Sequence, residues 1–179
     1  MTLSGLPEGS TERERMQAAW VAELVLQLVG KRKKKEKIRI LDIGCGDGLV
    51  TVALIEASPQ VFVISVMPEE AVPLVYALLN PYAESNRCCP APLDIMEYLP
   101  GTDRDVIDAA VAIFSLHRLK AEERAFALNE LIGFLKPGAG IVVDGGAEVA
   151  EELTKAGFVD VAQQTRGDLA PVVSARKPV

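Results

Sequence analysis

Residues 40–48 are the part of the sequence best suited to bind a small ligand. They have the sequence Ile-Leu-Asp-Ile-Gly-Cys-Gly-Asp-Gly, an apolar run followed by glycines at alternate positions. Glycine is needed where a strand turns abruptly into a helix, because a Cβ would block both the turn and the approach of a ligand. Asp42, just before the turn, would repel a pyrophosphate but suits an ammonium group. The spacing Gly-x-Gly-x-Gly also differs from the Gly-x-Gly-x-x-Gly of nicotinamide dinucleotide sites.

Strands and helices alternate on either side of this turn. Apolar runs predict strands at residues 38–43, 61–66, 88–93, 106–114, 141–144, 158–163 and 172–175. Helical spacing predicts helices capped at Ser10 or Thr11 and running to Val29, and at residues 49–57, 69–79, 121–135 and 148–156. This order is typical of a doubly wound, mostly parallel sheet. Pro90 and Pro92 favour an edge position for the third strand, because proline cannot donate to a strand ladder.

The composition predicts one globular α/β domain. The chain has 179 residues, of which 49% are hydrophobic and 25% charged, enough for one core. We expect an N-terminal arm, helix and basic connector at residues 1–37, followed by the main domain at residues 38–179. A net charge of −6 and an aromatic content of 5% argue against a nucleic-acid partner.

The cysteines and the N-terminus bear on the cellular compartment. Cys45, Cys88 and Cys89 are an odd set without spaced pairs, so we expect no disulfide framework and a reducing, cytoplasmic or similar compartment. The first residues do not resemble a signal peptide, and the apolar run at residues 18–29 contains Glu23 and is too short to span a bilayer. Together with the single histidine, the cysteines lack the spacing of metal ligands, so no metal site is predicted.

Several further motifs follow in a consistent order. An acidic segment lies at residues 93–100, an apolar strand with its loop at 108–119, a Lys-Pro-Gly turn into a strand at 135–143, and closing strands at 156–161 and 173–176. With the glycine turn, they resemble the class I S-adenosylmethionine-dependent methyltransferases from residue 38 to residue 177. The resemblance implies a Rossmann-like, doubly wound sheet of seven strands in the order 3-2-1-4-5-7-6, with helices on both faces. The third strand is then at an edge, in agreement with its prolines.

The resemblance implies S-adenosylmethionine as cofactor and assigns roles to individual positions. Asp42 would hold the methionine end, together with the loop residues Gly44, Cys45, Gly46 and Gly48. Asp94 would accept a hydrogen bond from the adenine amino group, with Ile95 beside the ring. Ile113 and Phe114, at the end of the fourth strand, would border the transferred methyl group.

The second strand departs from the family pattern. Its end would carry an acidic residue that binds both ribose hydroxyls, but the alignment puts Ser65 at this position, followed by Val66. A neutral serine bond is weaker than a charged bidentate pair, so the change could cost about 1–3 kcal/mol of cofactor binding. Glu69 or Glu70 could substitute if the following loop folds back.

His117 and the basic run are the remaining candidates for chemistry. His117 follows the fourth strand, where a neutral imidazole could act as a general base or could only position the loop. Methyl transfer mainly needs an in-line approach, so a base is not required. The basic residues between Lys31 and Lys37 precede the first strand and lie at the opposite end of the sheet, which favours a solvated connector over a phosphate site.

These features favour an S-adenosylmethionine-dependent methyltransferase that acts on an oxygen, nitrogen or carbon nucleophile. The alternative is a catalytically inactive methyltransferase-like subunit that serves as a scaffold in a larger assembly, which the Ser65 departure supports. Few residues are available for a cap after the fifth strand, so we expect an open site. It would suit a small molecule brought in under the N-terminal helix, or a protein substrate. The apolar face of that helix is also a candidate contact surface for a protein partner.

Overall fold

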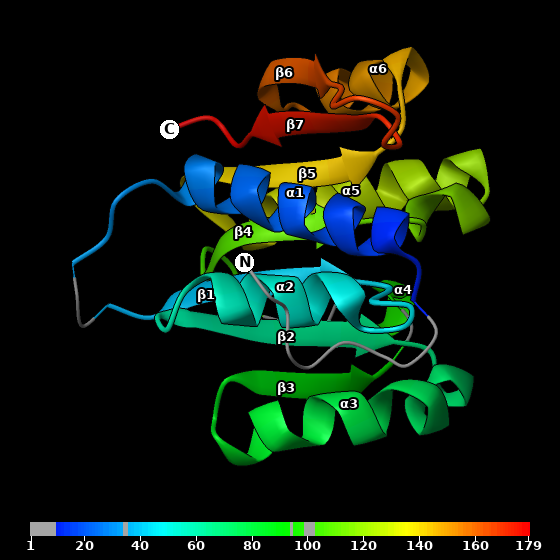
Figure 1. Ribbon diagram of the computed structural model, residues 1–179. Helices are drawn as coiled ribbons and strands as arrows, with labels where there is room; N and C mark the ends of the chain where they lie inside the picture. Colours follow the sequence, from blue (N-terminus) through cyan, green and yellow to red (C-terminus); the bar gives the residue numbers. More distant parts are fainter. Residues whose placement is uncertain (1–9, 34–35, 94, 99–102) are drawn as a thin grey trace.

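A computed structural model describes residues 10–33, 36–93, 95–98 and 103–179 of the chain. Its centre is one seven-stranded sheet in the order β3-β2-β1-β4-β5-β7-β6, with β7 antiparallel to its two neighbours (Figure 1). The strands are β1 (Ile38–Ile43), β2 (Val61–Met67), β3 (Cys88–Pro92), β4 (Ile107–Ala112), β5 (Leu135–Asp144), β6 (Val159–Gln164) and β7 (Val172–Arg176). The predicted strand order and fold class are confirmed.

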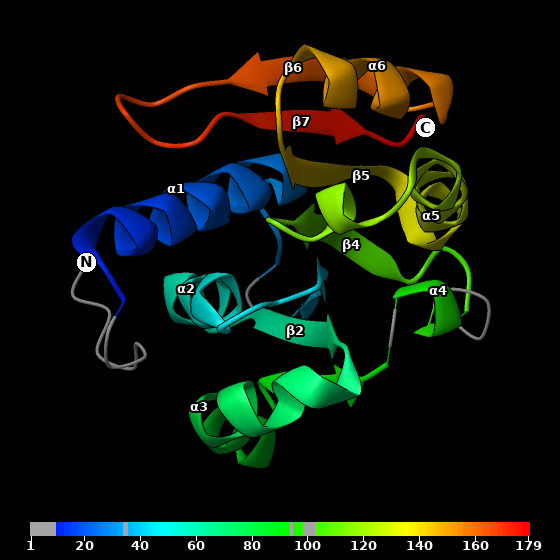
Figure 2. The same cartoon turned by 90° about the vertical axis from the view of Figure 1, so that its right-hand side faces the viewer.

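Helices cover both faces of the sheet, as Figure 2 shows. One face carries α1 (Glu12–Val29), α2 (Leu49–Ala57) and α3 (Val72–Glu84), and the other carries α4 (Ile95–Tyr98), α5 (Ala121–Phe134) and α6 (Ala147–Lys155). Two single 3₁₀ turns, η1 (Glu69–Ala71) and η3 (Leu116–Arg118), follow β2 and β4. The molecule therefore has three layers, and each helical layer has its own core.

The two cores follow from the alternation of side chains along each strand. Ile40 packs in the core beneath α1 and α2, whereas its neighbour Leu41 packs on the opposite side beneath α5. Both side chains are fully buried. Strands that bury both faces in this way have nearly continuous apolar sequences, and this is why the runs at β1, β2 and β4 were recognisable.

The apolar face of α1 is part of the core. Thr11 caps the helix in a capping box with Glu14, and Trp20, Val21 and Val25 are buried against the rest of the domain. The helix lies across α2, β4 and β5 (Figure 1). Its exposed large apolar side chain is Met16. The apolar face proposed from the sequence as a partner surface is thus used inside the domain.

Some element boundaries differ from those expected. The helix expected at residues 69–79 is divided into η1 and α3, and Pro73 lies in the first turn of α3, where a missing N–H costs no helical hydrogen bond. The Lys-Pro-Gly segment was expected as a turn before a short strand, but β5 already begins at Leu135. Leu135 pairs with Ile107, and the register then shifts before Ala109 pairs with Gly140. The irregular pairing accommodates the proline within the strand.

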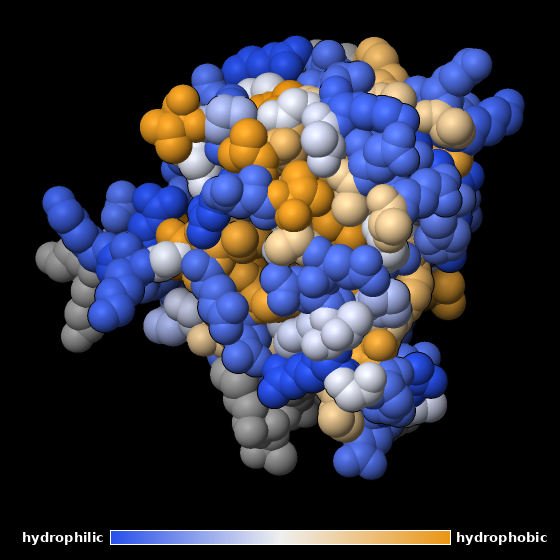
Figure 3. Space-filling model, turned by 90° about the horizontal axis from the view of Figure 1, so that it is seen from above, coloured by the Kyte–Doolittle hydropathy of each residue, from blue (hydrophilic) through white to orange (hydrophobic). Residues whose placement is uncertain are grey.

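Each free edge of the sheet carries a feature that limits pairing with another strand. The edge strand β3 contains Pro90 and Pro92, as predicted. The other edge strand, β6, has a register irregularity between Val159 and Ala162. Seen from this edge, apolar side chains gather near the centre of the surface within a hydrophilic surround (Figure 3).

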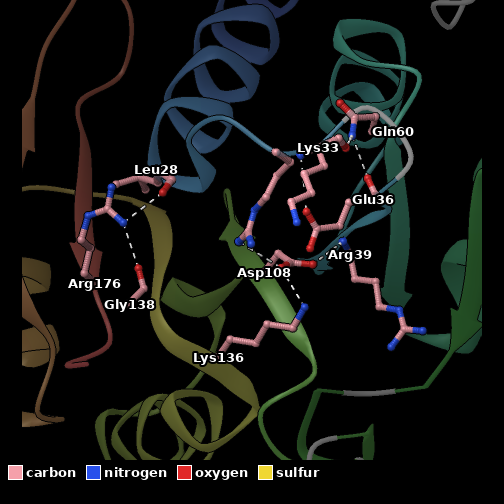
Figure 4. Close-up of polar contacts among 10 residues, drawn as sticks. Leu28, Lys33, Glu36, Arg39, Gln60, Asp108, Lys136, Gly138 and Arg176 are labelled. Carbon is pink, nitrogen blue, oxygen red and sulfur yellow. Dashed lines mark hydrogen bonds and ion pairs between the residues drawn. The ribbon is translucent and has the colours of Figure 1, made fainter.

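A buried carboxylate fastens the basic connector to the opposite end of the sheet from the glycine turn. Asp108 of β4 is 2% exposed and accepts hydrogen bonds from Lys136 Nζ at 2.8 Å, Arg32 Nη2 at 3.2 Å and the Arg39 backbone N–H at 2.9 Å (Figure 4). Gln60 Nε2 also donates to the backbone carbonyls of Lys33 and Glu36. The described part of the connector is therefore tied to β1, β4 and β5, beyond the solvated role expected for it.

We predict that Asp108→Ala lowers the free energy of unfolding by about 3 kcal/mol, measured by urea denaturation. Removing one partner of a buried charge pair usually costs about 3–5 kcal/mol, and the partly exposed cations here place the loss at the lower end. Asp168→Ala is the control, because its 3.9 Å ion pair with Arg13 is exposed and should contribute less than about 1 kcal/mol. Equal losses for both variants would show that Asp108 does not fasten the connector.

Candidate functional site

A cavity of about 600 Å³ opens at the carboxyl ends of β1, β2 and β4. At this position the connection after β1 runs to a helix on one face of the sheet, and the connection after β4 runs to a helix on the other face. Ligands usually bind at such a position in doubly wound sheets. The residues expected at the cofactor that line it are Asp42, Gly44, Cys45, Gly46, Val66, Ile95, Ile113 and Phe114. The cavity thus brings together most of the positions that the sequence motifs singled out.

The glycine turn is fixed by its neighbours on two sides. The N–H groups of Gly44 and Cys45 both donate to the carbonyl oxygen of Val66 in β2, at 2.8 and 3.2 Å. On the other side, a Cβ added at Gly44 would lie 2.4 Å from the Cβ of Ser115, and Gly44 has a φ of +64°. Gly44 therefore meets both requirements for glycine, a left-handed backbone and no room for a side chain.

Gly48 has a different role from the other two glycines. It precedes α2 with a φ of +83°, and it does not line the cavity. A Cβ there would lie 3.0 Å from side-chain atoms of Val75 and Leu78 on α3. Its contact with a cofactor stays a prediction, whereas its packing against α3 is observed.

Gly44→Ala and Gly46→Ala should separate backbone strain from crowding. Gly46 also has a positive φ, but its nearest heavy atom to an added Cβ is 4.0 Å away. We expect Gly46→Ala to cost about 1 kcal/mol of stability from the left-handed conformation. Gly44→Ala should cost about 1–3 kcal/mol more, because the loop after β4 must move. Thermal denaturation measures both, and a smaller loss for Gly44→Ala would contradict the close packing against Ser115.

Asp42 belongs to a buried chain of hydrogen bonds beneath the cavity. Thr51 of α2 donates to Asp42 Oδ2 at 2.5 Å, and the hydroxyls of Thr51 and Ser65 lie 2.8 Å apart. Asp42 and Ser65 are register neighbours on β1 and β2, so their side chains face the same layer. Because Thr51 has only one hydroxyl proton and gives it to Asp42, Ser65 donates to Thr51. Burial raises the pKa of Asp42 from its usual 3.8 to about 7, and the nearby carboxylate of Asp47 adds to the shift.

Asp42→Asn should change the pH dependence of stability in a defined direction. Because folding raises the pKa of Asp42, the folded wild type binds a proton more tightly and loses stability as the pH rises from about 4 to about 7. Asparagine can still accept the Thr51 bond but does not ionise. We therefore expect the variant to be more stable than the wild type at pH values above about 7, and the difference to vanish near pH 4. Parallel pH profiles in urea denaturation would contradict this assignment.

Ser65 does not line the cavity. Its side chain is fully buried, close to Thr51 and 3.5 Å from the sulfur of Cys88. The cavity wall at the end of β2 is formed instead by Val66, Met67 and Pro68. Glu69 and Glu70, which could have replaced the missing acid, lie in η1 and do not line the cavity either. In the described part of the chain, the region expected for the ribose thus has an apolar wall.

Phe114, just after β4, lines the cavity with an unusual backbone conformation. Phe114 has a φ of +55°, which is rare for a bulky residue, and its side chain lines the cavity while remaining 53% exposed. Its N–H donates to Asp144 Oδ1 at 2.8 Å, at the end of β5. This hydrogen bond holds the strained residue in place. Desolvation raises the pKa of the Asp144 carboxyl, although the bond from Phe114 opposes the shift.

His117 does not reach the large cavity. It lines a smaller one of about 110 Å³ between η3, α5 and α6, and its Nδ1 lies 3.9 Å from Asp144 Oδ2. The η3 turn directs the neighbouring Leu116 and Arg118 to the large cavity instead. The expected role as general base therefore has no support from this position, and the histidine contacts the site only through Asp144.

The adenine end of the predicted site is only partly described. Asp94, expected to bind the adenine amino group, lies outside the described residues, so its role stays a prediction. Ile95 lines the cavity as expected for a residue beside the ring, and Leu93 lines it as well. Leu93 is 43% exposed, which leaves an apolar surface at this end.

Sequence reasoning missed the contribution of α1. Arg13, Glu14, Gln17 and Ala18 line the cavity, and so does Ala170 before β7. Gln17 Nε2 donates to the carbonyl of Ala170 at 3.1 Å, whereas its buried Oε1 accepts no hydrogen bond from a described residue. The contact joins residues 153 positions apart, which no local pattern reveals. The only sequence signal was the expected location of the helix above the site.

In the described part of the chain, no group of three or more His, Cys, Asp or Glu side chains could hold a metal ion. The three cysteines are free in the structure, and burial raises the pKa of the Cys45 thiol. None of the described helices is both long and apolar enough to cross a membrane.

Solved structures with a similar fold include methyltransferases, whereas comparisons at the level of sequence find no match. No family model matches the sequence, and neither does any curated protein. Among solved structures, the CurJ carbon methyltransferase superposes with a TM-score of 0.77 at 15% identity, covering 95% of this chain and 56% of that one. The mitomycin 7-O-methyltransferase MmcR gives 0.71 at 17% identity, covering 93% and 54%. The chain has the fold of a class I S-adenosylmethionine-dependent methyltransferase.

A third similar structure is named for methyl transfer to a nitrogen atom. The 1,6-didemethyltoxoflavin-N1-methyltransferase of Burkholderia thailandensis, with S-adenosylhomocysteine bound, gives a TM-score of 0.68 at 19% identity, covering 94% of this chain and 79% of that one. The three similar structures are thus named for methyl transfer to carbon, to oxygen and to nitrogen. The chain spans just over half the length of the CurJ and MmcR structures.

Proposed function

We propose that this protein is an S-adenosylmethionine-dependent methyltransferase that acts on a small molecule. The observation that carries the proposal is the cavity at the glycine turn, where Asp42 and Gly44 meet the end of β4. The methyltransferase fold supports it. The alternative, an inactive scaffold, would have no physical need for a left-handed glycine and a buried carboxyl group at a cavity of this size.

The residues present fit the cofactor in three respects. A volume of about 600 Å³ lies within the range of about 300–1,000 Å³ that small-molecule sites occupy. The backbone at Gly46, which lines the cavity, is open to a ligand, because a Cβ added there would have no heavy atom closer than 4.0 Å. The Asp42 carboxyl lies at the cavity and, once ionised, suits the ammonium of a methionine moiety. Val66, Met67 and Pro68 would contact the ribose through apolar surface, so the affinity should be modest.

The cofactor, when bound, supplies an activated methyl group on a sulfonium. The chain would position the acceptor for an in-line approach, which can contribute much of the rate enhancement without acid–base catalysis. Phe114 and Ile113 at the end of β4 would border the reacting carbon. The cavity walls would exclude water from it.

Calorimetric titration with S-adenosylmethionine and S-adenosylhomocysteine tests the proposal. We expect saturable binding with a dissociation constant in the micromolar range. Because the pKa of Asp42 is about 7 before binding, an ammonium beside it should drive out a fraction of a proton near neutral pH. The measured heat should therefore depend on the ionisation enthalpy of the buffer.

Two variants make the titration specific for this site. Asp42→Asn should weaken binding and remove the dependence on the buffer. Asp160→Asn is the control, since Asp160 is exposed on β6 and does not line the cavity, and this variant should keep both the affinity and the buffer dependence. Absence of binding at millimolar cofactor would overturn the enzyme proposal and favour the scaffold.

A further inference from the structure

Phe114 lines the cavity in an unfavourable backbone conformation. A bulky residue at a φ of +55° is strained, and such strain persists where the surrounding structure enforces it. Here the bond to Asp144 enforces it. More than half of the ring is exposed, so the strain does not serve the packing of the core. The conformation instead offers an aromatic face at the point where the acceptor would lie.

Arg118, four residues further along the same loop, offers an unused positive charge. It lines the cavity and is exposed, and among the described residues its guanidinium has neither a hydrogen bond nor an ion pair. The other arginine of the cavity, Arg13, is already engaged with Asp168. A free guanidinium and an aromatic face in the same cavity suit a flat anion, because the guanidinium can pair with the negative group while the ring stacks.

At the Phe114 end, the cavity has no general base among its described residues, because the carboxylates of Asp42 and Asp47 lie at the glycine turn. Glu14 accepts hydrogen bonds from the N–H and the hydroxyl of Thr11, which lower its pKa and make it a weak base. Asp42 is buried and bonded to Thr51. His117 lies outside the cavity. An acceptor that arrives as an anion needs no base. It has no proton to lose when its oxygen bonds to the methyl carbon, and its charge cancels that of the sulfonium as the S–C electron pair stays on sulfur.

We propose that the methyl acceptor is a small planar aromatic anion whose ring lies on Phe114 and whose negative group pairs with Arg118. This inference rests on the proposed methyltransferase function and narrows its substrate class. Phe114 and Arg118 are then the residues that determine specificity, and Asp144 is a positioning residue that acts through the Phe114 backbone. The positive charge of Arg118 is local, because the chain has a net charge of −6 and Glu14, Asp42 and Asp47 also line the cavity.

Three matched probes test the inference by binding, with the protein saturated by S-adenosylhomocysteine. Naphthoate has both the flat ring and the charge, its fully hydrogenated analogue has only the charge, and naphthamide has only the ring. By calorimetry or ligand-observed NMR, we expect naphthoate to bind roughly fivefold or more tightly than either analogue. Phe114→Leu should remove the preference over the hydrogenated acid, and Arg118→Gln the preference over the amide.

Control variants and the cofactor titration keep the outcomes distinct. Phe126→Leu replaces a phenylalanine of similar exposure, 44%, that does not line the cavity, and Arg15→Gln removes an exposed charge from α1 outside it. Both should keep the wild-type preferences. If S-adenosylhomocysteine binds but the probes are not discriminated, or the controls act like the site variants, the aromatic-anion inference is wrong and the proposed function stands. If the cofactor product does not bind, both fall.

Discussion

The contact between Gly44 and Ser115 is the constraint on which the rest of the site depends. It joins the turn after β1 to the loop after β4, and these two strands are neighbours in the sheet although their paired positions, such as Ile40 and Ala109, are 69 residues apart in sequence. The same turn is bonded to β2 through the Val66 carbonyl. Three strand ends are thereby held at one point, and the cavity is the space that remains above them. A side chain at Gly44 would separate these loops before it touched any ligand.

The departure at Ser65 has a structural explanation that the sequence did not offer. Ser65 lies beside Asp42 in the register and shares Thr51 with it. An acidic side chain buried at this position would set a second carboxyl group next to one whose pKa is already raised, and both would resist ionisation. A serine completes the hydrogen-bond chain instead. The residue that the sequence marked as a departure is therefore compatible with the buried Asp42, with which it shares the Thr51 hydroxyl.

Much of the fold could be predicted because the relevant signals are local. Apolar runs marked the buried strands, alternate glycines marked the turn, and Pro90 and Pro92 marked an edge. Whether a given side chain faces the cavity was harder to predict. Whether Ser65 faces the cavity depends on its register with Asp42, and whether His117 does depends on the η3 turn. The part played by Gln17 depends on a contact with Ala170 across the chain. Such features arise from tertiary packing and leave no periodic trace in the sequence.

The outcome for His117 changes how the chemistry of the site is best understood. An imidazole at the cavity would have allowed the protein to activate a neutral hydroxyl or amine. The structure directs that side chain toward Asp144, whose carboxylate instead fixes the Phe114 backbone. These contacts thus fix the geometry of the loop, and geometry is what an in-line transfer from a sulfonium chiefly requires. A site of this kind selects acceptors that are nucleophilic on arrival, so charge and shape at Phe114 and Arg118, rather than proton transfer, would decide what is methylated.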